Sequence, residues 1–201
     1  MKTELKKYLK ELRLPSIREC FEEYAQRAVR ENYSYEEYLH ELIKLEYENR
    51  TQNKIGRFRR ESKLPMAKTL KSFNRDRLPT KVNQKLSALL LGAFTLKAEN
   101  VLAFGNAGSG KSHMICGIGH ELITQGKRVV FRTSALLVQE LLQAKKDLKL
   151  PSILKKLSRN DAIIIDDIGY VQQSREEMEV LFTLLADCYE RTSIMLTRNL
   201  S

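Results

Sequence analysis

The chain has 201 residues, of which 42% are hydrophobic, and this is enough for one buried core and a small second domain. No apolar run approaches the ~20 residues that span a bilayer, and the charged N-terminus lacks a signal-peptide core, so we expect a cytoplasmic protein with no membrane partner. The net charge of +10 favours polyanionic partners such as nucleic acid, while the spacing of the three cysteines argues against a disulfide framework or a zinc site.

Residues 1–74 have the pattern of an all-helical region. The stretch SIRECFEEYAQRAV follows Pro15 and repeats apolar residues at helical spacing, which predicts an amphipathic helix. Ser34 and Glu37 are placed to form a capping box at the start of the next helix. That helix should present a second apolar face, made of Tyr38, Leu39, Leu42, Ile43 and Tyr47.

The end of this second helix is strongly basic. The cations crowd around Phe58 and are Arg50, Lys54, Arg57, Arg59 and Arg60. One interpretation is a surface that binds the phosphates of DNA. The other is the solvated end of a long helix, where cations complement the helix dipole. The sequence leaves both open.

A segment with two prolines and no clear periodicity, residues 62–80, should form a linker, followed by a short helix over 81–94. From Asn100 onward, short apolar strands alternate with helices. Strands are expected at 101–105, 127–133, 161–167 and 192–199, with helices at 111–125, 134–147, 151–159 and 174–190. This alternation predicts an α/β fold with a parallel sheet covered by helices on both faces.

The stretch GNAGSGKS directly follows the first strand and precedes a helix. Its residues are Gly105, Asn106, Ala107, Gly108, Ser109, Gly110, Lys111 and Ser112, in the P-loop pattern G-x-x-x-x-G-K-S. The glycines allow a loop whose backbone N–H groups, together with the following helix N-terminus, bind phosphate oxygens. Lys111 would contact the terminal phosphates of ATP, and the Ser112 hydroxyl would bind Mg²⁺.

Two further strands end in polar residues that suit hydrolysis. Asp166 and Asp167 follow the buried strand AIII, at the carboxyl end where ligands bind in open α/β sheets. We expect Asp166 to bind Mg²⁺ through water and Asp167 to polarise the attacking water. Thr197 and Asn199 end the next strand and would lie beside the γ-phosphate, with Asn199 orienting the water. The predicted catalytic residues are therefore Lys111, Asp167 and Asn199.

With these motifs in order, the chain resembles the IstB-like ATP-binding proteins, which are helper ATPases of transposition related to the DnaC helicase loader and the DnaA initiator. The resemblance covers almost the whole chain. It is carried by YLKELRLPSIRECFEEYA, SYEEYLHELIKLEYENR, KTLKSFN, ENVLAFGNAGSGKSHMICGIGHEL, IIIDDIGY and TRNLS. Arg198 stands where the family usually has serine, while Asn199 keeps the functional position.

The resemblance implies a P-loop NTPase of the AAA+ class preceded by a small all-α domain. Residues 1–74 would bind DNA or a partner, residues 75–201 would form the ATP-binding core, and His113 would join the nucleotide site. The implied function is nucleotide-dependent self-association on duplex DNA, which presents the complex to a transposase. The alternatives are a helicase loader that grips a replicative helicase, or an inactive remnant.

The family core continues, beyond the position matched by Ser201, with another strand and an arginine finger. The resemblance therefore implies an AAA+ core that is incomplete at its C-terminus. An arginine finger contributes roughly 10³–10⁵ in rate, so we expect ATP hydrolysis by this chain alone to be weak or absent.

Overall fold

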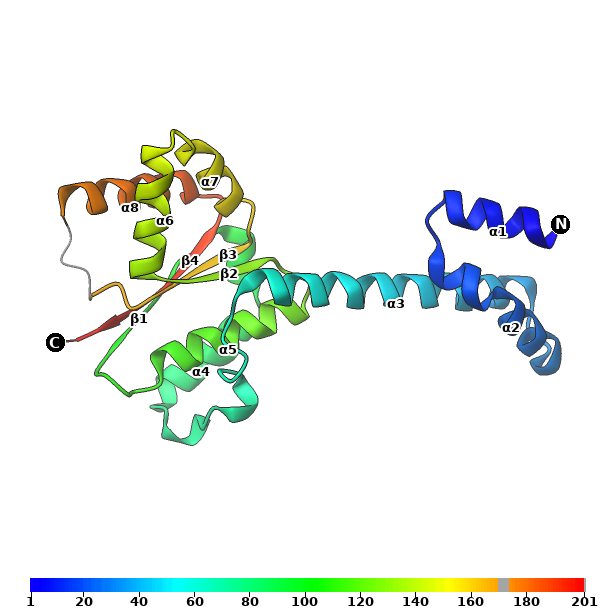
Figure 1. The fold of residues 1–201 in the computed structure, drawn as a ribbon. Helices are drawn as coiled ribbons and strands as arrows, with labels where there is room; N and C mark the ends of the chain where they lie inside the picture. Colours follow the sequence, from blue (N-terminus) through cyan, green and yellow to red (C-terminus); the bar gives the residue numbers. More distant parts are fainter. Residues whose placement is uncertain (170–173, 201) are drawn as a thin grey trace. The chain divides into compact units, whose positions relative to one another are not determined.

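The computed structural model describes residues 1–169 and 174–200 of the chain (Figure 1). The helices are α1 (Lys2–Glu11), α2 (Pro15–Glu31), α3 (Tyr35–Ser62), α4 (Thr80–Leu90), α5 (Lys111–Thr124), α6 (Ser134–Lys146), α7 (Leu150–Leu157) and α8 (Arg175–Cys188), with short 3-10 helices η1 (Leu70–Ser72), η2 (Arg75–Arg77) and η3 (Ala93–Lys97). The strands are β1 (Val101–Gly105), β2 (Val129–Thr133), β3 (Ala162–Asp166) and β4 (Ser193–Asn199). In the part of the chain that the structure describes, none of the helices is both long enough and apolar enough to cross a membrane.

The chain divides into two compact units, Met1–Gly56 and Arg57–Ser201, and the division falls inside α3. Residues 57–74 therefore belong to the same compact unit as the strands. The sequence places its functional boundary at residue 74, and the assignment of DNA or partner binding to residues 1–74 stays a prediction.

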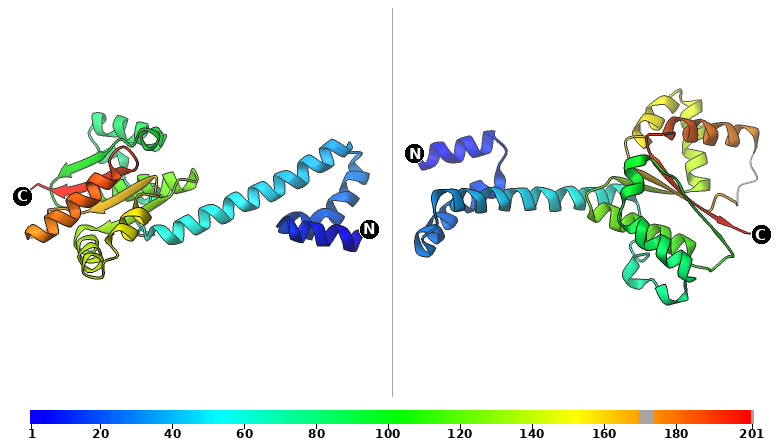
Figure 2. Two further views of the ribbon diagram at one scale, coloured as in Figure 1. Left: turned by 90° about the horizontal axis from the view of Figure 1, so that it is seen from above. Right: turned by 180° about the vertical axis from the view of Figure 1, so that it is seen from behind.

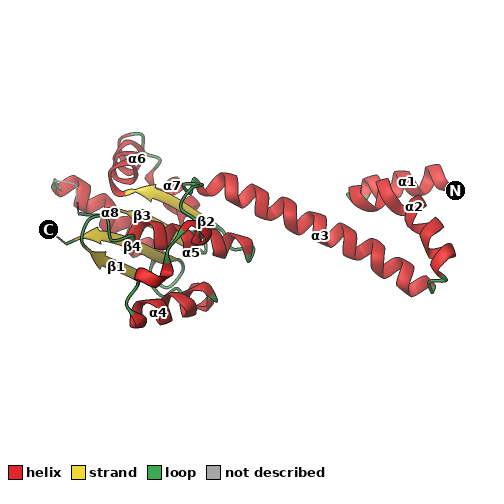
Figure 3. Cartoon of the chain, turned by 90° about the horizontal axis from the view of Figure 1, so that it is seen from below, coloured by secondary structure: helices red, strands yellow, loops and turns green. Residues whose placement is uncertain are grey.

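The second unit is built on a parallel sheet, as predicted. Its four described strands follow the order β1-β4-β3-β2, and every neighbouring pair is parallel. Helix α5 covers one face of the sheet, while α6, α7 and α8 lie on the other (Figure 1, Figure 3). Because β4 lies between β1 and β3, the carboxyl ends of these three strands are neighbours (Figure 2). The β1–β4 register places Gly105 opposite Asn199.

The helices on both faces explain why β3 reads as an unbroken apolar run. Ile163 and Ile165 pack into a core with residues of α6, α7 and α8. Ile164, which points to the opposite face, lies against Gly119 of α5. All three isoleucines are fully buried, and a strand buried on both faces cannot alternate apolar and polar residues.

The first unit has a small core of its own, formed by Leu9, Ile17, Phe21 and Leu42. Tyr38 packs against this core, so part of the predicted second apolar face is buried. The rest of that face is not, because Leu39, Ile43 and Tyr47 have 58%, 51% and 71% of their surface exposed. Within this unit, the helix pair α1–α2 packs against one side of α3 only.

The predicted Ser34–Glu37 capping box is confirmed, since each residue's backbone N–H donates to the other's side chain at 2.7 and 3.1 Å.

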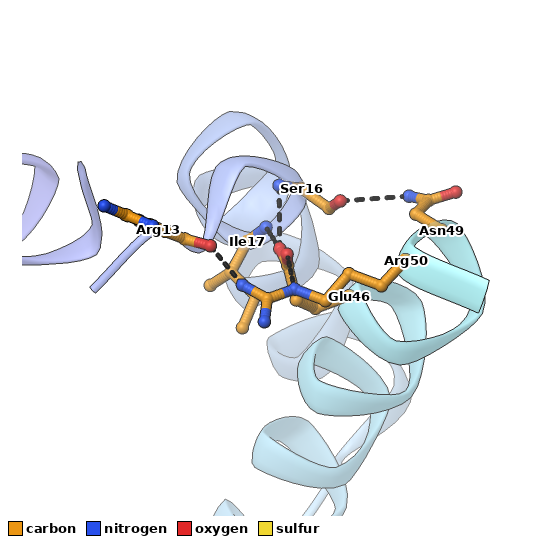
Figure 4. Close-up of polar contacts among 6 residues, drawn as sticks. All are labelled: Arg13, Ser16, Ile17, Glu46, Asn49 and Arg50. Carbon is orange, nitrogen blue, oxygen red and sulfur yellow. Dashed lines mark hydrogen bonds and ion pairs between the residues drawn. The ribbon is translucent and has the colours of Figure 1, made fainter. Parts of the chain in front are cut away.

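A buried carboxylate connects α2 to α3 in the first unit (Figure 4). Helix α2 begins with Pro15, and its N-cap, Leu14, offers no side-chain acceptor. The first N–H groups of a helix need a partner from outside the helix. Glu46 of α3 supplies it, because its Oε2 accepts from the backbone N–H of Ser16 at 2.8 Å and of Ile17 at 3.2 Å.

Arg50 completes this contact from the next turn of α3. Its Nε donates to Glu46 Oε1 at 2.8 Å, and its guanidinium also donates to the Arg13 carbonyl oxygen (Figure 4). Asn49 adds a hydrogen bond to the Ser16 hydroxyl. Burial alone would raise the pKa of the Glu46 carboxyl, but the bonds from Arg50, Ile17 and Ser16 together hold that pKa below its usual value of 4.5.

We predict that Glu46→Ala selectively loosens the first unit. The change leaves two N–H groups of α2 and the Arg50 guanidinium without their acceptor, which should cost about 1–3 kcal/mol of local stability. Hydrogen exchange of peptides from α1 and α2 should accelerate, while exchange in the sheet stays unchanged. Glu48→Ala, at an exposed position of the same helix, is the matched control and should exchange like the wild type.

The wild type and a Glu46→Gln variant should differ in their response to acid. A carboxyl whose pKa is lowered in the folded state contributes stability above the unfolded-state pKa of about 4.5, and this is lost as the pH falls through the folded-state value. The difference between wild type and Glu46→Gln should therefore shrink in exchange measurements below pH ~4.5. An equal difference at every pH would show that the carboxylate charge of Glu46 contributes nothing.

Candidate functional site

The P-loop connects β1 to α5 in the second unit, as the sequence predicts. Gly110 immediately precedes α5 and has a φ of +86°, in the left-handed region that favours glycine. A Cβ at this position would also lie only 3.1 Å from the ring of Phe73. Both observations explain why the motif needs glycine there. The N-terminus of α5, with its outward N–H groups and positive dipole end, is suited to binding an anion.

The Lys111 ammonium lies against the loop that precedes it. Its Nζ donates to the carbonyl oxygen of Asn106 at 2.7 Å and to the Ser109 hydroxyl at 3.4 Å. The positive charge is thereby held against the P-loop itself. This is the position that the motif predicts for a cation that binds phosphate.

Thr197 on β4 positions Asp166, the last residue of β3, and Asp167, which follows it. Its buried hydroxyl donates to Asp166 Oδ1 at 2.6 Å and accepts the backbone N–H of Asp167 at 2.8 Å. One hydroxyl therefore holds both aspartate residues. The sequence places Thr197 at the γ-phosphate, but it does not reveal this bridge, which depends on β3 and β4 being neighbours in the sheet.

Asp167 turns the chain directly after β3. It has a φ of +65°, which is uncommon for a residue other than glycine, and the bond from its N–H to Thr197 supports this conformation. Its Oδ1 accepts a hydrogen bond from Asn199 Nδ2 at 3.0 Å. The two residues that the sequence assigns to water activation are therefore in direct contact.

These groups line one polar cavity of about 340 Å³. Its lining contains most of the predicted nucleotide and metal residues, namely Ala107, Gly108, Gly110, Lys111, Ser112, His113, Asp166, Asp167 and Asn199. Lys68, from the segment between α3 and α4, lines the same cavity and was not predicted. An apolar cavity of about 440 Å³ lies beside it and shares Gly110 and Lys111 with it.

His113 lines the polar cavity, but its ring nitrogen Nε2 makes a hydrogen bond outside the cavity lining. Its Nε2 donates to the Thr69 carbonyl oxygen at 2.8 Å, and its ring meets Phe73 edge-on at 5.2 Å. The observed contacts of His113 are thus with the chain that precedes the core, and its role toward a nucleotide stays a prediction.

The predicted DNA-contacting residues have different surroundings. In the first unit, Arg50 is bound to Glu46 and Lys54 has an interaction partner of its own. In the second unit, the Arg57 guanidinium lies 5.4 Å from the centre of the Phe58 ring. Arg59 and Arg60 are exposed, and Arg59 projects from a different side of the helix than Arg57, because residues two apart do not share a helix face. DNA contact by these residues stays a prediction.

Comparison with known proteins identifies relatives along nearly the whole chain. The sequence profile of the family described as IstB-like ATP binding protein matches residues 7–201. An insertion-sequence ATP-binding protein of Sinorhizobium fredii is 38% identical over 192 residues, which cover 95% of this chain and 64% of that protein. An insertion-sequence ATP-binding protein of Geobacillus stearothermophilus is 32% identical over 201 residues, covering 100% of this chain and 80% of that protein.

The fold has counterparts among solved structures. The structure of the DnaC helicase loader superimposes with a TM-score of 0.60 at 17% identity, covering 68% of this chain and 78% of that chain. At this level of identity the likeness concerns the fold, which is that of the AAA+ P-loop NTPases.

We predict that Thr197→Val destabilises the site without changing its volume. Valine leaves the Asp167 N–H without an acceptor and Asp166 without a donor, in a buried position. The free energy of unfolding should fall by about 1–3 kcal/mol in denaturant titrations. Thr183→Val, at a half-buried position of α8 where the hydroxyl donates to the Glu179 carbonyl oxygen of the same helix, is the control and should unfold like the wild type to within about 0.5 kcal/mol. Equal stability of both variants would contradict a bridging role for Thr197.

Proposed function

The chain belongs to the family of IstB-like ATP-binding proteins, and from this premise we propose that it is an AAA+ ATPase that assists DNA transposition. The observation that carries the proposal is the polar cavity, in which the P-loop, Asp166, Asp167 and Asn199 meet. Self-association with bound nucleotide, duplex DNA and a transposase partner are parts of the same proposal.

The nucleotide would bind across the two adjoining cavities. The P-loop amides and Lys111 would hold the phosphates in the polar cavity. The apolar cavity, lined by Phe73, Leu78 and Val82 among others, suits the flat, weakly polar surface of a base. The two cavities share the start of α5, which is where the phosphate chain of a bound nucleotide would lie.

The polar cavity also fits Mg²⁺, which prefers oxygen ligands. Two oxygen-bearing side chains line it, Ser112 directly after the P-loop glycines and Asp166 at the end of β3. Thr197 orients one carboxylate oxygen of Asp166 and leaves Oδ2 for the cavity. When bound, the ion would neutralise charge that develops on the phosphates during transfer.

Asp167 and Asn199 would position the attacking water. The hydrogen bond from Asn199 fixes one oxygen of the Asp167 carboxylate. The second oxygen would then accept a proton from water, and the Asn199 side-chain oxygen would offer another acceptor. Asp167 is shorter than glutamate by one methylene, so its reach toward the γ-phosphate depends on the turn that Thr197 supports.

A helicase-loader function is the second candidate. It is favoured by one observation in the first unit, the row of exposed apolar residues on α3 formed by Tyr35, Leu39, Ile43 and Tyr47. Their spacing of four residues places them along one side of a helix. An exposed apolar row of this kind suits a protein partner better than DNA.

We predict that ATP with Mg²⁺ raises the melting temperature of the wild-type chain and leaves that of Lys111→Ala unchanged. A ligand that binds only the folded state stabilises it by about 2.7 kcal/mol at a concentration of 100 Kd. Thermal denaturation with and without nucleotide measures the shift. Lys127→Ala, at a lysine just beyond the opposite end of α5, is the control and should respond like the wild type. A wild-type chain that melts identically with and without Mg·ATP would contradict the proposal.

We predict that duplex DNA binding depends on the basic end of α3. The double variant Arg59→Ala/Arg60→Ala should bind more weakly in gel shifts, and its plot of log affinity against log salt should be less steep by about 0.9 per lost phosphate contact. Lys155→Ala/Lys156→Ala removes the same charge from exposed positions of α7 and is the control. If both double variants behave alike, the net charge rather than the end of α3 governs binding. A wild-type chain that does not bind DNA would favour the helicase-loader alternative.

A further inference from the structure

Within the second unit, the chain that leads from α3 to the core is fastened to the P-loop helix. We call residues Leu64–Phe73 the strap. Two histidines of α5 hold its backbone: His113 Nε2 donates to the Thr69 carbonyl oxygen at 2.8 Å, and His120 Nε2 donates to the Pro65 carbonyl oxygen at 3.1 Å. Because carbonyl oxygens only accept, each of these ring nitrogens carries the proton. The strap therefore has a defined position along α5.

Close packing reinforces this position. A Cβ at Gly117 of α5 would lie 2.7 Å from Leu70 Cδ2, so Leu70 occupies the space that a side chain would need. At the other end of the strap, the Phe73 ring packs edge-on against His113. The Ser72 hydroxyl donates to the Ala67 carbonyl oxygen at 2.8 Å, which folds the middle of the strap into a compact turn. These contacts fix the backbone from which Lys68 projects.

Lys68 extends from the strap into the polar cavity. Its Nζ lies 3.9 Å from Asp166 Oδ2, the carboxylate oxygen that Thr197 does not bind. Its side chain remains 37% exposed, so the ammonium keeps access to the open part of the cavity. A lysine carries its charge on a flexible stem and can change partners without any movement of the backbone.

The charges in the cavity indicate which group the Lys68 ammonium would contact in place of Asp166. Among the residues that the structure describes, the lining contains two lysines, Lys68 and Lys111, and two aspartates, Asp166 and Asp167. A magnesium–nucleotide complex brings excess negative charge on its phosphates. A divalent cation at Asp166 would repel the Lys68 ammonium, while the phosphate oxygens would attract it. Both effects move the Lys68 ammonium away from Asp166 and toward the phosphates.

We propose that Lys68 is a phosphate-binding residue of the nucleotide site, supplied by the strap rather than by the P-loop or the strand ends. The inference rests on the proposed nucleotide-binding function. Lys68 pairs with Asp166 when no phosphate is near, and its ammonium contacts the polyphosphate of a bound nucleotide. The strap thereby contributes directly to nucleotide affinity, through a residue that lies outside the recognised motifs.

The experiment measures the equilibrium binding of Mg·ATP to the full chain by titration calorimetry. Lys68→Ala should raise Kd by roughly tenfold or more, as expected for loss of one charge-assisted hydrogen bond. Lys68→Arg keeps the charge and should recover most of the affinity. Lys71→Ala removes the same charge from an exposed position of the strap and should bind like the wild type. Melting of each ligand-free variant checks that the fold is intact.

The controls separate this inference from the proposed function. If the wild type binds, Lys111→Ala does not, and Lys68→Ala binds like the wild type, then Lys68 has no phosphate contact and the nucleotide site stands. If Lys68→Ala and Lys68→Arg lose affinity equally and both melt at lower temperature than Lys71→Ala, the residue has a structural role only, which also overturns the inference. If the wild type itself does not bind Mg·ATP, the proposed function fails and the inference fails with it.

Discussion

The hydroxyl of Thr197 is the contact on which the geometry of the site depends. It donates to Asp166 and accepts from the backbone of Asp167, so one buried group on β4 orients the last residue of β3 and the residue that follows it. This is possible only because β3 and β4 are neighbouring parallel strands that end at the same edge of the sheet. The pairing of β4 with β1 on its other side brings Asn199 opposite Gly105, where the P-loop begins. The strand order alone therefore places three separate segments around one cavity.

The parts of the site that the sequence predicts are those whose chemistry is local. The P-loop needs glycine at Gly110 and a helix after it, and both requirements are visible in the motif and the residues that directly follow it. The aspartates follow an apolar run long enough to be a buried strand. The Ser34–Glu37 capping box could likewise be identified, because its two partners are three residues apart. In each case the interacting groups are close in the sequence.

The parts that the sequence does not predict depend on which elements pack together. The strap reads as an aperiodic linker, because its contacts are made by backbone carbonyl oxygens with His113 and His120, more than forty residues away. From the sequence, Glu46 is indistinguishable from a surface residue of a long helix. Its role depends on the N-terminus of α2, which has no side-chain cap of its own and lies beside Glu46 in the fold. The apolar residues of α3 cannot be sorted into buried and exposed by periodicity alone, since that depends on how much of the helix α1 and α2 cover.

Asp166 shows how a fixed and a variable interaction can share one side chain. The bond from the buried Thr197 hydroxyl to Oδ1 sets the orientation of the carboxylate, and a short hydrogen bond between two buried groups is costly to break. The ion pair of Oδ2 with Lys68 is longer and partly exposed, so it is weak and easily exchanged. A ligand can therefore replace Lys68 at Asp166 while Thr197 keeps the carboxylate in place.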